Sequence, residues 1–314
     1  MQGANSNTPI DFDGEVDLRE LFNVLLQGKW IIVSVTAFVF IITVIYSLFL
    51  PNIYESKALL VPHNSSSGIS GALKSYSGLA GLAGINLSSN GAEDNSLQAI
   101  EKISSLSFFE NNILTNIYLP DLMAVKAWDP KTNILTYDKN VYDVKSSTWV
   151  RDYSYPQQQI PSAQETFKVF IDKHLNVKRD NKSGFISISI KHQSPHVSKQ
   201  LVELIVVEIN NFFRERDKLE SQKAISYLNH QISMTSFSEI KDALAQLVKD
   251  QTKKLTLVEA NEFYVLGYID APALMEIKSE PNRAIICILG ALIGGLLSIF
   301  LLLLRHFVFI EKAR

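Results

Sequence analysis

The sequence predicts an α+β domain that lies between two transmembrane helices and carries a long, protruding helical hairpin. Three observations predict this fold class. Two uncharged apolar runs stand near the ends of the 314-residue chain, at 30–50 and 284–304. Several segments between them have strand composition, and one long stretch, from Pro195 to Gly267, has no glycine or proline between those two residues. The predicted segments are tails at 1–29 and 305–314, spans at 30–50 and 284–304, and an external domain at 51–283 with extended helices at about 195–261.

Composition excludes some classes of partner. The chain is 46% hydrophobic with a formal net charge of -2, so no basic field exists for a nucleic acid, and we expect no nucleic-acid partner. Cys287 is the only cysteine and lies within the second apolar run. The external domain therefore has no disulfide, and its own core or neighbouring subunits must hold it together.

The two apolar runs predict membrane spans and an orientation. Each run has about 21 residues, which at ~1.5 Å rise per residue matches a hydrocarbon core of roughly 30 Å. The first run follows a polar, acidic tail and no small-residue cleavage site comes after it, so we expect a retained anchor and not a signal peptide. The basic residues of the short tails place both tails in the cytoplasm: Arg19, Lys29, Arg305, Lys312 and Arg314.

The N-terminal tail divides into two parts. Residues 1–14 read as disordered, whereas from Asp17 the segment DLRELFNVLLQGKW places its leucines and Phe22 on one helical face. That pattern is typical of a short amphipathic helix on lipid at the inner membrane surface. A simple continuation of the spanning helix is the alternative.

Three segments have the composition of strands in one sheet close to the membrane. They are IYESKALLVP at 53–62, the alternating FISISI at 185–190, and FYVLGYID at 263–270. The Gly/Ser-rich segment 64–95 predicts a flexible loop. Because it also carries Leu79, Leu82 and Ile85, ordering against a partner is the alternative.

The helices between these strands are predicted from apolar spacing and capping. Residues 96–118 predict an amphipathic helix, with a break left open, and residues 128–149 predict irregular structure with room for one hairpin. Ser162 with Glu165 is a capping box that opens a helix to about Leu175.

A long helix begins where Ser194 caps and Pro195 takes the first helical position, and we expect it to reach about Met234. Residues 214–223 are polar nearly all round, so this part should leave the globular base as a solvated rod. A turn and cap at 235–238 then start a second, returning helix.

No recognised chemistry marks the chain as an enzyme. Its six histidines form no HExxH motif and have no cysteine partners, and a site at His192 and His196 is disfavoured by the proline between them. P-loop, nucleophile-elbow and dinucleotide motifs are missing as well. We therefore expect no catalytic residues, no cofactor and no metal.

Two features adjoin the second span. Pro272 and Pro281 predict a stiff, extended connector that approaches the membrane. Gly290 and Gly294 form a GxxxG pair with Gly295 beside it, which leaves a notch for another helix. A chance occurrence of glycine in an apolar segment is an equally weighted alternative.

Taken together, DLRELF before the first span, IYESKALLVP after it and the proline-containing approach to a glycine-containing second span resemble the Wzz family. These are class 1 polysaccharide co-polymerases, the O-antigen chain-length determinants of Gram-negative inner membranes. Met275 stands where further prolines are common in the family. No kinase follows Leu304, so the chain does not look like the tyrosine autokinase relatives.

The resemblance implies a homo-oligomeric ring with the central domains in the periplasm. Such a ring works with the O-antigen polymerase on the growing lipid-linked polysaccharide and sets its modal length without forming glycosidic bonds. The alternatives are a regulator of another surface polysaccharide, a membrane-anchored periplasmic sensor or adaptor, and an anchored periplasmic enzyme.

Overall fold

The computed structural model describes residues 25–62 and 91–311 and divides the chain into two compact units. One unit combines the chain ends, Met1–Pro51 with Pro281–Arg314, and the other is Asn52–Glu280. Two predictions fall outside the described residues. These are most of the amphipathic helix that begins at Asp17, and residues 64–90 of the Gly/Ser-rich segment, which include Leu79, Leu82 and Ile85. The end of that predicted loop, residues 91–95, instead forms the start of a helix, Gly91–Ile103.

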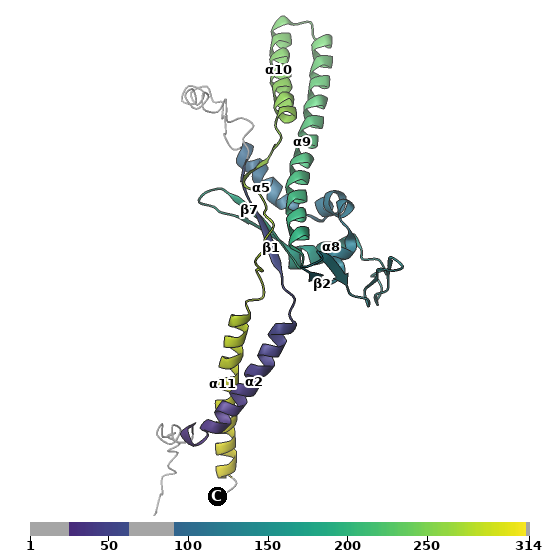
Figure 1. Cartoon of the computed structure of the whole chain (residues 1–314). Coiled ribbons are helices and arrows are strands. Elements are labelled where there is room, and N and C mark those ends of the chain that lie inside the picture. The colour runs from purple at the N-terminus through teal and green to yellow at the C-terminus, as the bar shows by residue number, and fades with distance from the viewer. Residues whose placement is uncertain (1–24, 63–90, 312–314) are drawn as a thin grey trace, which may run out of the picture. The chain divides into compact units, whose positions relative to one another are not determined.

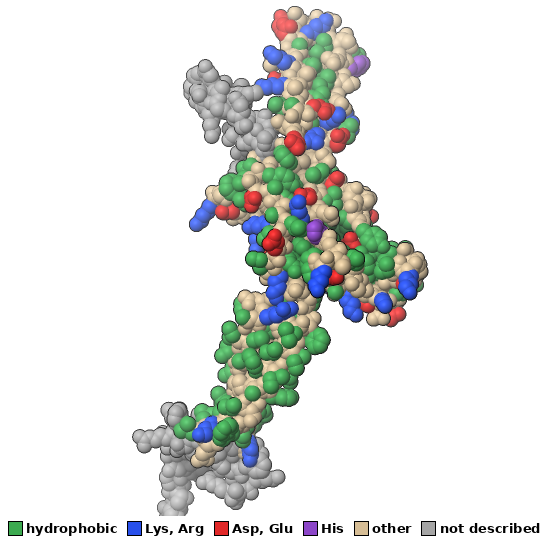
Figure 2. Space-filling view, in the orientation of Figure 1, with side chains coloured by type: hydrophobic (Ala, Val, Ile, Leu, Met, Phe, Trp, Pro, Cys, Tyr) green, Lys and Arg blue, Asp and Glu red, His purple; other side chains and the backbone are tan. Residues whose placement is uncertain are grey.

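The first unit is a pair of apolar helices in contact with each other, α2 (Lys29–Phe49) and α11 (Arg283–Glu311) (Figure 1). Lys29–Phe49 and Arg283–Arg305 are long and apolar enough to cross a membrane, and only 6% and 22% of their apolar windows are buried by protein. Figure 2 shows hydrophobic side chains over the visible face of this pair between its two ends. Surfaces of this composition and length match the hydrocarbon core of a bilayer.

The second unit is built on a four-stranded antiparallel sheet in the order β6-β7-β1-β8. Its strands are β6 (Leu175–Arg179), β7 (Ile186–His192), β1 (Tyr54–Pro62) and β8 (Leu266–Asp270). Ala58 stands opposite Ile188 and Leu60 opposite Ile186, so small and large apolar side chains alternate on one face. This alternation makes one face of the sheet the floor of the core.

Helices cover that apolar face. The first half of α9 (Pro195–Met234) contacts β1 and β7, and α5 (Gly91–Ile103) contacts α9 and β1. Short helical turns complete the layer: α6 (Leu106–Phe108), the π-helix η1 (Phe109–Ile113), the 3-10 helix η2 (Leu114–Asn116), α8 (Ala163–Val169) and the π-helix η3 (Phe170–His174). The largest fully buried side chains are Phe108, Phe109, Phe170, Phe213, Leu60, Ile103, Ile113, Ile186, Ile188, Ile190, Ile205 and Ile209. Dense aromatic and branched packing of this kind supplies most of the stability of a domain without disulfides.

A second, smaller core lies beside the sheet. It is built from α7 (Leu119–Met123) and two short antiparallel hairpins, β2 (Val125–Asp129) with β3 (Ile134–Tyr137) and β4 (Tyr142–Asp143) with β5 (Thr148–Trp149). Tyr142, Trp149 and Ala124 are its buried members. Four tyrosine and tryptophan rings meet there edge to face, which is a favourable geometry for aromatic pairs.

A helical hairpin rises from the sheet-bearing part of the second unit. The second half of α9 runs antiparallel to α10 (Ser238–Ala260), and the chain then returns to the sheet as β8 (Figure 1). Within α10 only Val258 is buried, so the two helices share a narrow seam. The two flanking candidate spans, the α+β domain and the long helical hairpin confirm the predicted fold class.

Several local predictions are refined by the structure. The helix expected to reach about Leu175 stops one residue earlier, and β6 follows at once, because Leu175 and Val177 alternate as an edge strand does. Segment 128–149 holds parts of two hairpins and not one. The predicted helix at 96–118 breaks after Ile103, and Ser105 caps the next turn by accepting a hydrogen bond from the Phe108 amide.

Two predictions about polar residues of the hairpin differ from the structure, the first of them only in part. The stretch 214–223 is not a fully solvated rod, because Asp217 and Ser221 are buried there. The expected cap of the returning helix is also missing, since α10 starts after Phe237 without a side-chain cap. By contrast, Ser194 Oγ accepts from the Val197 amide at 3.4 Å, as its position before Pro195 predicts.

Candidate functional site

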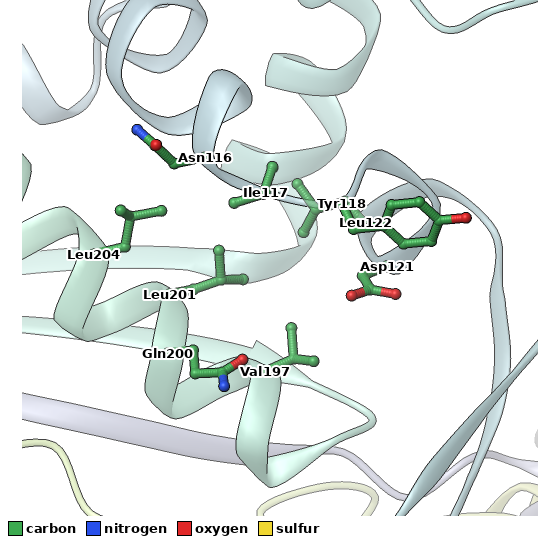
Figure 3. Close-up of a pocket in the computed structure, with 9 residues that line it drawn as sticks. All are labelled: Asn116, Ile117, Tyr118, Asp121, Leu122, Val197, Gln200, Leu201 and Leu204. Atoms are coloured by element: carbon green, nitrogen blue, oxygen red, sulfur yellow. The ribbon is translucent and has the colours of Figure 1, made fainter.

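The second unit contains a cavity of about 380 Å³ between α7 and the start of α9 (Figure 3). Its lining is mixed. Five aliphatic side chains form the floor, and four polar or aromatic residues stand at the rim: Ile117, Leu122, Val197, Leu201 and Leu204, then Asn116, Tyr118, Asp121 and Gln200. In Figure 3 the aliphatic side chains of α9 point toward Ile117, and the Asp121 carboxylate stands at one edge. Cavities of roughly 300–1,000 Å³ with an apolar lining and a few placed polar groups are typical of small-ligand sites.

Asp121 is held in place by the tyrosine core. Tyr137 donates its hydroxyl to Asp121 Oδ1 at 2.6 Å, and the carboxylate is partly buried. Burial raises the pKa of Asp121, and the hydrogen bond from Tyr137 opposes that rise. Only one of the two oxygens takes part in this bond, so the other remains able to accept from a ligand.

Tyr118 stands at the edge of the cavity and is 51% exposed. Its hydroxyl lies 2.6 Å from that of Tyr142, and this hydrogen bond raises the pKa of Tyr118 to about 12. The Tyr118 hydroxyl is therefore protonated and held by Tyr142, while the other side of the ring faces solvent.

Two neighbouring histidines, with rings tilted by 32°, contact the same helical turn. The rings of His174 and His192 have centroids 5.6 Å apart, and His192 Nε2 lies 2.7 Å from the carbonyl oxygen of Asp121. The Ser194 amide donates to His192 Nδ1 at 3.0 Å, so Nε2 carries the proton. Burial lowers the pKa of His192 to about 4 and also lowers the pKa of His174. Both rings are thus neutral structural links between β7, α7 and the start of α9.

His192 and His196 do not form a site, as the proline between them led us to expect, because His192 is buried beside His174 and His196 is exposed. Among the residues that the structure describes, no group of three or more potential metal ligands lies together.

The root of the helical hairpin is joined to β8 by buried polar groups. Asn210 donates to the Leu266 carbonyl at 3.0 Å and accepts from the amides of Val265 and Leu266 at 2.8 and 3.1 Å. About two turns further along α9, the buried Asp217 carboxylate accepts a hydrogen bond from the Tyr264 hydroxyl at 2.7 Å. Buried polar groups that are fully paired fix one arrangement of the elements that carry them. The hairpin is therefore anchored in direction by side chains of α9.

The predicted glycine notch faces the chain's own first span. A Cβ added at Gly290 would lie 2.7 Å from Cβ of Thr43, and one at Gly294 would lie 3.0 Å from Cβ of Val39. Gly295 is different, because nothing lies within 4 Å of a Cβ at that position. Small residues that let two helices approach closely are the usual means of helix packing in lipid. The structure thus brings Gly290 and Gly294 against α2 and leaves Gly295 outside that contact.

The connector that holds Pro272 and Pro281 is extended, with neither helix nor regular strand from 271 to 282. Pro272 is buried, and Ser56 Oγ donates to the neighbouring Ala273 carbonyl at 2.9 Å. A bridge between Ile53 and Glu280 then joins the two ends of the second unit. These two contacts hold this part of the connector against β1 and the residue before it.

Sequence reasoning missed the cavity residues. Asp121 lies in the short helix α7 and Tyr118 is its N-cap residue, whereas Gln200 lies on α9 about eighty residues later. No local motif links two such segments, so only their packing brings them together.

Comparisons with known proteins address the family. Residues 14–116 match the family model described as Wzz, chain length determinant protein. This range includes α2, β1 and α5. The resemblance predicted from the sequence is confirmed over these residues. No curated protein sequence matches the chain.

Two solved structures are similar to the chain at low identity. A full-length bacterial polysaccharide co-polymerase is 14% identical with a TM-score of 0.42, over 95% of this chain and 100% of that one. A fragment of WzzB, the polysaccharide co-polymerase from Salmonella Typhimurium, is 12% identical with a TM-score of 0.31, over 73% of this chain and 100% of that one.

Proposed function

We propose that this member of the Wzz family of chain length determinants, assigned through residues 14–116, sets the modal length of lipopolysaccharide O-antigen as a polysaccharide co-polymerase. The family match carries the proposal, because it covers the first candidate span and the start of the sheet. The order of elements supports it, since two apolar helices flank an α+β domain with a helical hairpin.

The proposed location is the inner membrane of a Gram-negative cell, with both tails cytoplasmic and the central domain periplasmic. Lys29 is the first residue of the first candidate span, and Arg305 is the last residue of the second. Basic residues in short flanking segments favour the cytoplasmic side.

The proposed form is a homo-oligomer in which hairpins of neighbouring subunits pack together. The hairpin exposes large apolar side chains along its length, which its own narrow seam does not cover: Leu219, Tyr227, Met234, Phe237, Ile240 and Leu247. These residues, five on the two helices and Phe237 in the turn between them, exceed what an isolated solvated hairpin needs. A second copy of the same hairpin would cover them with matching chemistry.

The proposed action is that of a scaffold and not of a catalyst. The ring would contact the O-antigen polymerase and the growing lipid-linked polysaccharide, and it would determine how long the polymerase continues. The chain itself would form no glycosidic bond and would need no cofactor.

Deletion of the gene tests this proposal. A gel of lipopolysaccharide from the deletion strain should show an unregulated distribution of O-antigen lengths, and the restored gene should return a clustered distribution. Loss of all polymer would contradict the proposal and favour an enzyme. A normal O-antigen pattern with a changed length of another surface polysaccharide would assign the chain to that polymer.

A further inference from the structure

We propose that the cavity between α7 and α9 binds one neutral sugar unit that carries a methyl-bearing group, such as a 6-deoxyhexose or an N-acetylhexosamine. The inference rests on the proposed function, which brings a saccharide chain to this domain. It goes further by assigning a binding site, its lining residues and the chemical class of the sugar.

Size and surface chemistry agree with a sugar ligand. The cavity has a volume of about 380 Å³, which is at the lower end of small-ligand sites of roughly 300–1,000 Å³. Its aliphatic floor suits the C–H face of a pyranose and a methyl substituent. Its rim offers the amides of Asn116 and Gln200 and the carboxylate of Asp121, which are donors and acceptors for ring hydroxyls.

The charge at the rim selects against acidic sugars. None of the nine lining residues is Lys or Arg, whereas Asp121 contributes a carboxylate. A uronic acid would place a second carboxylate beside Asp121 with no cation between them, which is unfavourable in a partly buried site. A hydroxyl group, in contrast, donates directly to the oxygen of Asp121 that does not accept from Tyr137.

The site is held rigidly, which lowers the cost of binding. Asp121 is fixed by Tyr137, and its backbone carbonyl accepts from the buried His192 ring at 2.7 Å. Gln200, Val197, Leu201 and Leu204 lie on consecutive turns of α9, whose start is capped by Ser194. Sites built on packed elements are pre-organised for their ligands.

Binding is tested with the full chain in lipid nanodiscs by saturation-transfer NMR. The probes are the methyl glycosides of rhamnose, of N-acetylglucosamine and of glucuronic acid. We expect saturation of at least one of the two neutral probes, strongest at the C6 methyl of the rhamnoside or the acetyl methyl of the glucosaminide and weaker at the glycosidic O-methyl that all three probes share, and none of the glucuronide.

Two variants on the exposed side of α9 locate the binding. Gln200→Trp fills the cavity from its rim, whereas Val207→Trp places the same side chain two turns away on the same helix at an exposed position outside the lining. We expect the first to abolish the signal and the second to leave it unchanged. Asp121→Asn, which keeps a planar polar group, should weaken binding by about tenfold, because it replaces a charged acceptor with a neutral one. Binding of neither neutral probe, equal binding to Gln200→Trp, or preference for the glucuronide would overturn the proposal.

The outcome separates this proposal from the proposed function. If the wild-type gene restores clustered O-antigen lengths but neutral glycosides do not bind, the site is rejected and the function stands. If the glycosides bind at Gln200 and Asp121 but deletion leaves O-antigen lengths unchanged, the site stands and the function is rejected.

Discussion

Asn210 is the residue whose removal should most directly loosen the helical hairpin. The substitution Asn210→Ala removes the side chain that pairs with the Val265 amide and with both backbone groups of Leu266. Val265 is 3% and Leu266 0% exposed, so water cannot reach these groups in the folded protein. Each buried backbone group left without a partner costs ~1–3 kcal/mol, and groups that share one side chain are not additive. We expect Asn210→Ala to lower the free energy of unfolding by about 3–5 kcal/mol.

The matched control is the neighbouring Asn211→Ala. Asn211 Oδ1 accepts one hydrogen bond from Arg214 at 3.1 Å, and Asn211 is only partly buried. Its loss should cost less than about 1 kcal/mol. Chemical unfolding of the full chain in mild detergent gives the two free energies.

Hydrogen exchange supplies a local readout of the same prediction. In Asn210→Ala the amides of Val265 and Leu266 should exchange much faster than in the wild type, while amides of the α2 and α11 pair should not change. If the two variants have equal free energies of unfolding, and the amides of residues 265–266 exchange as fast in Asn210→Ala as in the wild type, the view that Asn210 anchors the hairpin is refuted.

Three further predictions concern the membrane pair, the pH dependence of stability and the Gly/Ser-rich segment. Gly290→Leu should push α11 away from Thr43 and lower the free energy of unfolding, measured by thermal denaturation in nanodiscs, by about 1–2 kcal/mol. Gly295→Leu should have no such effect. Equal effects of the two substitutions would show that the contact with α2 is unimportant. Because the pKa of His192 is about 4 when folded and 6.5 otherwise, the unfolded chain binds the extra proton between these values. The contribution of His192 to the free energy of unfolding should therefore fall by up to about 3 kcal/mol from pH 6.5 to 4. His192→Gln should lose this contribution and keep that of His174, whose pKa burial also lowers; an undiminished slope would contradict the assignment. If residues 64–95 pack between subunits, limited proteolysis should spare them in the oligomer and cut them in the monomer, and equal cutting would favour a plain loop.

Much of the fold was predictable because its signals are local. The two spans follow from length and polarity alone, and α9 follows from a cap at Ser194, Pro195 and forty residues without a break. The strand 185–190 follows from strict alternation, and β1 proves to be its partner and also the partner of β8. These elements need no tertiary information to be recognised.

Other elements depended on packing that a sequence does not display. The edge strand β6 was missed because helical capping at Ser162 led into it without a glycine or proline. Asp217 looked like one of many solvated charges, yet it is buried because Tyr264 meets it from the returning chain.

The candidate sites divide in the same way. The glycines of α11 were recognisable by their spacing, but the sequence does not say which helix they face, and the structure places α2 against two of them. The cavity lined by Asp121 and Gln200 needed the tertiary structure, because its two halves are far apart in sequence.

The most direct test of the central claim separates the amount of polymer from its length. Total O-antigen sugar and its size distribution should be measured in the same deletion strain while the gene is restored from an inducible promoter. A scaffold that sets length predicts a nearly constant total and a distribution that narrows around one mode as the protein accumulates. A total that rises in proportion to the protein, with no change in the shape of the distribution, would contradict the account.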